Sequence, residues 1–117
     1  MPGNRISEKQ LISVVVPIYK EQDNVRPLVD RLKKIFDKLD LNWELIFAMD
    51  PSPDETEQRI LGLIEAGYPI RLISFSRRIG KPLSLLAGLD HVTGAACVVI
   101  DADLQDPPEL IEKMIEE

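Results

Sequence analysis

Short apolar runs alternate along the chain with segments in which apolar residues recur every three or four positions. Runs rich in β-branched residues suit buried strands, whereas the three-and-four spacing suits amphipathic helices. The pattern predicts strands over residues 11–17, 43–49, 70–75 and 96–100. It predicts helices over residues 25–39, from Ser52 to about Gly67, over residues 82–89, and a last one that opens at Asp106. Such alternation predicts a mainly parallel, Rossmann-like α/β sheet with helices on both faces.

The loops that follow the strands are predicted to share one edge of this sheet. Ligands of open parallel sheets bind at the carboxyl ends of the strands. The loops concerned are residues 17–21, 49–54, 76–81 and 101–106. We therefore expect one functional rim built from four separate parts of the sequence.

The fourth loop carries the strongest chemical signal. Asp101-Ala102-Asp103 places two carboxylates directly after an apolar strand, where they repel each other unless a cation or a donor compensates. Mg²⁺ and Mn²⁺ prefer oxygen ligands and commonly combine one or two carboxylates with substrate phosphates. We prefer this interpretation to a solvated strand exit. By contrast, Asp106 and Glu109 match a capping box and are better explained as a helix start.

The third loop, residues 76–81, contains Arg77, Arg78, Gly80 and Lys81 just before a predicted helix. Clustered cations near a helix N-terminus suit phosphate, with solvated surface charge as the alternative. This concentration of cations in one loop favours a functional role for it.

The second loop begins with Asp50, directly after a strand. Asp50 could accept hydrogen bonds from a base or ribose, and a structural role is equally plausible on sequence alone. Ser52, Asp54 and Glu55 are explained as helix capping, with Ser52 as the N-cap and Pro53 at the first helical position.

Composition narrows the class of protein. The net charge of −6 and pI near 4.8 argue against a nucleic-acid partner. Cys97 lies in an apolar run and is interpreted as a buried small hydrophobe, while His91 is the only histidine, so zinc is not expected. There is no membrane-spanning stretch, signal peptide, P-loop or dinucleotide fingerprint, so we expect a soluble chain.

Four segments of the chain carry a family resemblance: VVVPIYKE from Val14, SRRIGK from Ser76, LAGLD from Leu86 and DADLQDPPE from Asp101. They resemble family 2 glycosyltransferases of the GT-A fold, specifically the branch that transfers sugars to polyprenyl or dolichyl phosphates. The similarity runs from about Ile12 to the C-terminus, so we expect residues 1–10 to form a polar N-terminal segment and residues 11–117 to form the donor-binding part of one domain.

The resemblance implies a role for each matching position. Asp50 would contact the base or ribose, and Asp103 would be the principal protein ligand of a divalent metal, Mg²⁺ or Mn²⁺. The nucleotide sugar would be bound by Pro17, Tyr19, Glu21, Asp50, Lys81, Asp101, Ala102, Asp103 and Gln105. The family usually has Asp-Asp-Gly-Ser after the second strand, where this chain has Met49-Asp50-Pro51-Ser52, so base recognition is expected to differ.

The resemblance also implies a reaction. The complete enzyme would transfer a hexose from a UDP- or GDP-sugar to polyprenyl phosphate at the cytoplasmic face of the membrane. The catalytic base and acceptor-binding residues are expected after Glu117, so the chain alone would be inactive, and a homo-oligomer is compatible with the sequence. The alternatives are transfer to a saccharide hydroxyl and a non-catalytic nucleotide-sugar-binding module.

Overall fold

The computed structural model describes residues 11–92 and 96–100 of the chain. The strands are β1 (Leu11–Ile18), β2 (Asn42–Met49), β3 (Ile70–Ser74) and β4 (Ala96–Val99), and the helices are α2 (Gln22–Leu39), α3 (Thr56–Glu65) and α4 (Lys81–Leu89). These elements confirm the predicted strands, and they confirm the predicted helices within the described residues with small shifts at their ends. The polar segment 1–10 and the helix predicted at Asp106 lie outside the described residues.

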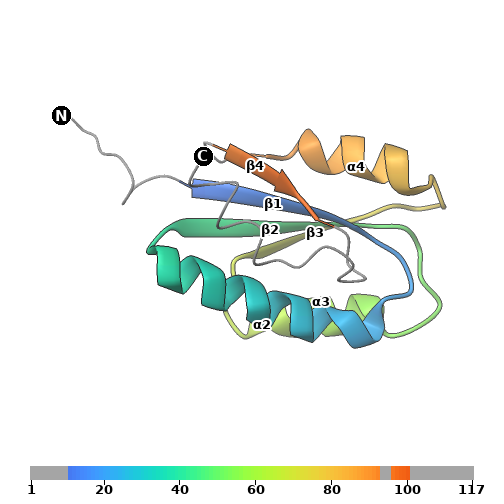
Figure 1. Cartoon of the computed structure of the whole chain (residues 1–117). Helices are drawn as coiled ribbons and strands as arrows, with labels where there is room; N and C mark the ends of the chain where they lie inside the picture. The colour runs from blue at the N-terminus through green and yellow to red at the C-terminus, as the bar shows by residue number, and fades with distance from the viewer. Residues whose placement is uncertain (1–10, 93–95, 101–117) are drawn as a thin grey trace.

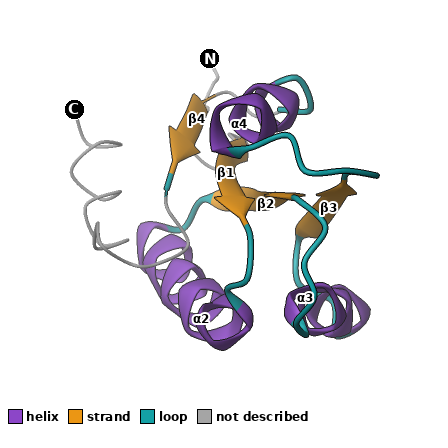
Figure 2. Cartoon of the chain, turned by 90° about the vertical axis from the view of Figure 1, so that its right-hand side faces the viewer, coloured by secondary structure: helices purple, strands orange, loops and turns teal. Residues whose placement is uncertain are grey.

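The strands form a parallel sheet in the order β3-β2-β1-β4. Helices α2 and α3 lie on one face of the sheet and α4 lies on the other (Figures 1 and 2). This arrangement confirms the predicted architecture. It also brings the exits of β3, β2 and β1 next to one another along one edge, because parallel neighbours end on the same side.

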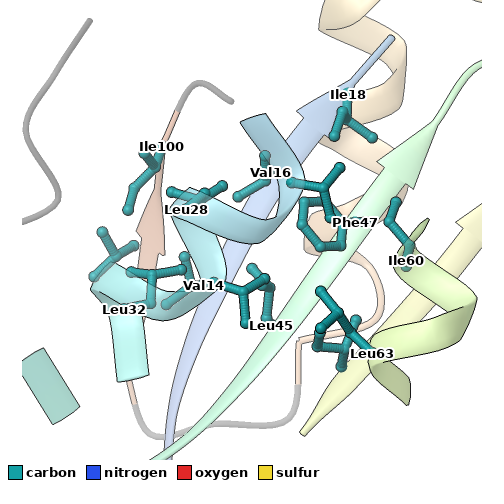
Figure 3. Packing of buried hydrophobic residues seen from close by; sticks show 14 of the residues in the cluster. Val14, Val16, Ile18, Leu28, Leu32, Leu45, Phe47, Ile60, Leu63 and Ile100 are labelled. Atoms are coloured by element: carbon teal, nitrogen blue, oxygen red, sulfur yellow. The ribbon is translucent and has the colours of Figure 1, made fainter. Parts of the chain in front are cut away.

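The main core lies between the sheet and helices α2 and α3 (Figure 3). Alternate residues of a strand point to the same face, so Val14 and Val16 of β1 lie beside Leu45 and Phe47 of β2. The helices cover these side chains with apolar residues spaced three and four apart, including Leu28, Leu32, Ile60 and Leu63. All of these side chains are buried.

Helix α4 approaches the opposite face through small residues. A Cβ atom placed on Gly88 would lie 2.6 Å from Cγ1 of Val15 and 3.6 Å from Cβ of Ala48. Only glycine at this position permits so short a distance between helix and sheet. Several other apolar side chains of α4 are exposed: Leu83 is 55% exposed and Leu86 is 58% exposed.

The interpretation of Cys97 as a buried residue is wrong, because its side chain is exposed. Within the described sheet β4 is an outer strand that pairs with β1, and α4 packs over β1 and β2. Partial burial still raises the pKa of the Cys97 thiol, and the nearby Glu44 carboxylate raises it further. His91 is exposed, as expected for a surface residue, with Nδ1 2.9 Å from the Ala87 carbonyl oxygen.

Candidate functional site

A pocket of about 250 Å³ lies at the carboxyl edge of the sheet. The loops after β1, β2 and β3 all contribute to its wall, which confirms that these predicted rim loops gather. Its lining residues are Pro17, Ile18, Tyr19, Glu21, Asp50, Arg78, Gly80 and Ser84. The fourth predicted loop, with Asp101, Ala102, Asp103 and Gln105, lies outside the described residues. The described chain reaches this edge at Ile100, whose N–H donates to the Val15 carbonyl oxygen at 3.1 Å.

The loop after β2 is fastened to the loop after β1. The Ser52 hydroxyl accepts the Lys20 N–H at 3.1 Å, and the Thr56 hydroxyl accepts the Glu21 N–H at 3.1 Å. The prediction that Ser52 caps the following helix is wrong. Helix α3 begins at Thr56, and its N-cap residue Glu55 makes no side-chain capping bond. Ser52 is instead used to hold the neighbouring loop.

Asp54 orients the two hydroxyl groups, those of Ser52 and Thr56, that hold the loop after β1. Its carboxylate accepts hydrogen bonds from the Ser52 hydroxyl, from the Thr56 N–H at 3.1 Å and from the Thr56 hydroxyl at 2.6 Å. Burial alone would raise the pKa of the Asp54 carboxyl, but these hydrogen bonds outweigh it and lower the pKa from 3.8 to about 2. Asp54 therefore stays ionised and keeps the two hydroxyls oriented toward it.

Asp50 lies at the start of the loop between β2 and α3, directly after β2, and is 4% exposed. Its Oδ1 accepts the Ile79 N–H at 3.1 Å, and its Oδ2 accepts the Gly80 N–H at 3.0 Å. The Ser84 hydroxyl, on α4, also donates to Oδ1 at 3.4 Å. Gly80 has a φ of +86°, a backbone conformation that favours glycine. Asp50 thus lines the pocket while its carboxylate binds the loop before α4.

Arg78 and Tyr19 meet across the pocket. The Arg78 guanidinium carbon lies 4.2 Å from the centroid of the Tyr19 ring, and Lys20 Nζ lies 5.4 Å from the same centroid. Glu21 is held by Asn24, whose Nδ2 donates to its carboxylate at 3.1 Å. An aromatic ring beside cations can hold a planar, anionic ligand, because the ring stacks on a base and the cations attract phosphate.

Four pocket residues were not predicted as individual site residues: Ile18, Arg78, Gly80 and Ser84. Arg78 was part of the predicted basic loop but was not distinguished from its neighbours. Ser84 was missed, although it is 2% exposed on a helix whose other residues are largely apolar. A buried hydroxyl in such a helix needs a hydrogen-bond partner, and this requirement was the available signal. Lys81 begins α4, and its side chain lies outside what the structure describes.

The described residues supply no complete metal site. Across residues 11–92 and 96–100, no group of three His, Cys, Asp or Glu side chains is placed to hold a metal ion. The predicted metal ligand Asp103 is outside these ranges. In the same residues, no helix combines the length and apolar character needed to cross a bilayer.

The model of glycosyl transferase family 2 matches residues 13–117. The chain belongs to this family. A bactoprenol glucosyl transferase of Shigella phage SfX is 41% identical over 106 residues, which are 90% of this chain and 34% of the relative. A dolichol-phosphate mannosyltransferase of Pyrococcus furiosus is 35% identical over 105 residues, 90% of this chain and 29% of the relative. The chain spans about a third of the length of the curated relatives it matches.

Solved structures of similar fold contain nucleotides and manganese. A mannosyltransferase from Pyrobaculum calidifontis, in complex with GDP-Man and Mn²⁺, has a TM-score of 0.68 and 25% identity over 82% of this chain and 32% of its own. A glucosyl-3-phosphoglycerate synthase from Mycobacterium tuberculosis, in complex with Mn²⁺ and UDP, has a TM-score of 0.67 and 30% identity over 90% of this chain and 38% of its own. Both support a GT-A fold for the family 2 chain.

Proposed function

We propose that this chain forms the donor-binding part of a glycosyltransferase that transfers a hexose from a UDP- or GDP-sugar to a polyprenyl phosphate. The observation that carries the proposal is the pocket at the carboxyl edge, where Arg78 lies over the Tyr19 ring and Asp50 forms part of the same wall. At about 250 Å³ the pocket is smaller than the ~300–1,000 Å³ typical of drug-sized ligands. It suits a nucleobase or ribose, and we propose that the rest of the donor extends beyond it.

The roles within the pocket follow from its chemistry. Tyr19 supplies the stacking surface, Arg78 supplies a cation next to it, and Pro17 and Glu21 complete the wall. We propose that Lys81 adds a second cation toward the diphosphate. Asp101, Ala102, Asp103 and Gln105 are proposed to bind the sugar diphosphate and a divalent metal, with Asp103 as its protein ligand. Structures of family neighbours that contain Mn²⁺ support this metal requirement.

A lipid phosphate acceptor is supported by the names of the relatives, which specify bactoprenol and dolichol phosphate. We propose that an acceptor phosphate oxygen attacks the anomeric carbon of the sugar in one inverting displacement. The bond from that carbon to the diphosphate oxygen breaks, and the nucleoside diphosphate leaves with the electron pair. A divalent cation, when bound, supplies charge neutralisation for this leaving group. The reaction is proposed to take place at the cytoplasmic face of the membrane.

Calorimetric titration with UDP-glucose and GDP-mannose, each with and without Mn²⁺, tests donor binding directly. We expect one donor to bind, to bind more tightly with Mn²⁺, and to lose this metal effect in the Asp103→Asn variant. Arg78→Ala should weaken binding about tenfold, the equivalent of about 1.4 kcal/mol for a lost charge-assisted contact. Failure of both donors to bind would overturn the proposal, and binding that ignores both Mn²⁺ and Asp103→Asn would overturn its metal component.

Arg26→Ala is a matched control for the Arg78 variant. Arg26 also lies near an aromatic ring, with its guanidinium carbon 5.9 Å from the Tyr68 centroid, but it does not line the pocket. Its replacement should leave donor affinity unchanged. Equal losses in the two variants would show that the effect of Arg78→Ala is not specific to the pocket.

Transfer to polyprenyl phosphate is expected to need residues beyond this chain. Incubating it with radiolabelled donor and a polyprenyl phosphate should therefore give binding without product. Turnover by the chain alone would contradict that expectation, whereas a longer protein containing this sequence should form the lipid-linked sugar. Donor binding without transfer in that longer protein would favour the non-catalytic module, and transfer to a saccharide hydroxyl would favour the other alternative.

A further inference from the structure

We infer that Asp50 acts on the donor pocket as a positioning residue, by holding the β3–α4 loop that carries Arg78. The inference rests on the proposed function for its consequence, since the loop is important for donor binding only if the pocket binds a donor. Its structural part stands on the contacts of Asp50 alone.

The Asp50 carboxylate is held by donors of the β3–α4 loop and of α4. Its carboxylate has about four lone-pair positions. Three are directed to donors of the protein: the Ile79 N–H at 3.1 Å, the Gly80 N–H at 3.0 Å and the Ser84 hydroxyl at 3.4 Å. The side chain is also anchored at its base, because the Asp50 N–H donates to the Ile18 carbonyl oxygen at 3.3 Å. Asp50 therefore joins the exit of β1, the exit of β2 and the start of α4.

Two adjacent N–H groups bound by one carboxylate fix the orientations of the two peptide units on either side of Ile79. The first of these units joins Arg78 to Ile79, and Gly80 adopts its positive φ just before the first turn of α4. The two hydrogen bonds to Asp50 therefore fix the backbone path of the β3–α4 loop and the position of the Arg78 Cα atom. Without Asp50, two N–H groups in a half-buried turn would lack their acceptor, and the loop would have to move to reach water.

The loop between β2 and α3, which begins with Asp50, also contains a second carboxylate for comparison, that of Asp54. Asp54, four positions along the chain, binds Ser52 and Thr56 and through them holds the β1–α2 loop. Asp50 therefore holds the β3–α4 loop, and Asp54 holds the β1–α2 loop. Replacing either one by asparagine removes one acceptor oxygen and introduces an amide donor, so Asp50→Asn and Asp54→Asn are chemically matched variants.

Hydrogen exchange measured by NMR on the ligand-free chain tests the anchoring. In Asp50→Asn one acceptor oxygen remains, so we expect the protection factor of at least one of the Ile79 and Gly80 amides to fall about tenfold, the effect of losing about 1.4 kcal/mol of hydrogen bonding. In Asp54→Asn the Ile79 and Gly80 amides should keep their protection, because the Asp54 carboxylate accepts hydrogen bonds from Ser52 and Thr56 and not from the β3–α4 loop. Unchanged protection of Ile79 and Gly80 in Asp50→Asn would overturn the inference.

Donor titration of the same proteins separates positioning from direct contact. Asp50→Asn should lose both amide protection and donor affinity, whereas Arg78→Ala should lose affinity and keep the protection. A loss of affinity in Asp50→Asn without any change in exchange would mean that Asp50 contacts the donor directly. If the wild-type chain binds no donor, the proposed function fails, and the exchange data still decide whether Asp50 holds the loop.

The wild-type protein provides an independent test should Asp50→Asn not fold, as judged by circular dichroism. The Ile79 and Gly80 amides must then exchange at least tenfold more slowly than amides of an unstructured peptide, about 1.4 kcal/mol of protection. They should also show through-hydrogen-bond scalar coupling to the Asp50 carboxyl carbon. Unprotected exchange at both positions would overturn the inference without any variant.

Discussion

The two faces of the sheet are built in different ways. On the face covered by α2 and α3, large side chains such as Phe47 and Leu45 interlock with helical leucines and isoleucines. On the opposite face, α4 approaches Val15 and Ala48 through Gly88, with no room for a methyl group. One face is stabilised by the volume of its side chains and the other by the short distance between helix and sheet.

This difference has consequences for the pocket. The α2/α3 face fixes the sheet itself, while α4 carries Ser84 and follows the loop of Arg78, so its position affects one wall of the pocket. Removal of side-chain volume should therefore destabilise the α2/α3 face most, and addition of side-chain volume should destabilise the α4 face most.

The largest expected effect is on the packed face. Phe47→Ala removes a fully buried ring from the centre of the core and should lower the free energy of unfolding by about 3–5 kcal/mol. This is a large part of the ~5–15 kcal/mol typical of a folded domain. Urea denaturation followed by circular dichroism measures it. A loss below about 1 kcal/mol would show that the site collapses around the cavity.

On the α4 face the corresponding change is an addition. Gly88→Ala would place a methyl group 2.6 Å from Val15 Cγ1 and should cost about 1–3 kcal/mol, despite the better helix propensity of alanine.

Gly62→Ala is the matched control, because Gly62 lies in α3 and nothing is within 4 Å of a Cβ placed there. This variant should be stabilised by up to about 1 kcal/mol. The same denaturation experiment serves both. If both variants were stabilised, helix propensity rather than close approach would determine both effects.

A smaller effect is expected where the α2/α3 face meets the rim, and it depends on pH. The folded-state pKa of Asp54, about 2, is below its ordinary value of 3.8, so its contribution is present above pH 4 and is lost as the pH falls toward 2. The difference in free energy of unfolding between wild type and Asp54→Asn should therefore shrink between about pH 4 and about pH 2. A difference that stays constant over this range would contradict the assigned hydrogen bonds.

The smallest effect is expected on the outer side of α4. Leu86 is 58% exposed, so Leu86→Gln should change the free energy of unfolding by no more than about 0.5 kcal/mol. Thermal unfolding at matched concentration measures this change. A loss above about 1 kcal/mol would indicate that Leu86 is covered by another surface in solution.

Most of the fold could be predicted because each element carries a local signal. The β-branched run before Pro17 and the spacing of Val25, Leu28 and Leu32 specify a strand and a helix without reference to the rest of the chain. The exposure of Cys97 could not be predicted in this way. It depends on which strands pair and on where α4 ends, and neither is encoded in the residues around Cys97.

The site was predictable to the level of loops but not of contacts. Strand exits located Tyr19, Glu21 and Asp50 at the rim, because parallel strands end together. The hydrogen-bond partner of Ser52 could not be predicted in the same way. Its sequence context suits a helix cap, yet its hydroxyl accepts an N–H from Lys20, which lies 32 positions away. Such a contact depends on tertiary structure, which outweighs a local capping pattern.

The contacts that hold the β3–α4 loop bear on how the ligand preference of this pocket could be redesigned. Asp50 binds the main chain of Ile79 and Gly80, so the anchor does not depend on the identity of the side chain at position 79. A library that varies residues 76–79 while keeping Asp50 and Gly80 would explore new pocket surfaces on an unchanged backbone path. The loop offers variable recognition on a fixed support, as antibody loops do on their framework.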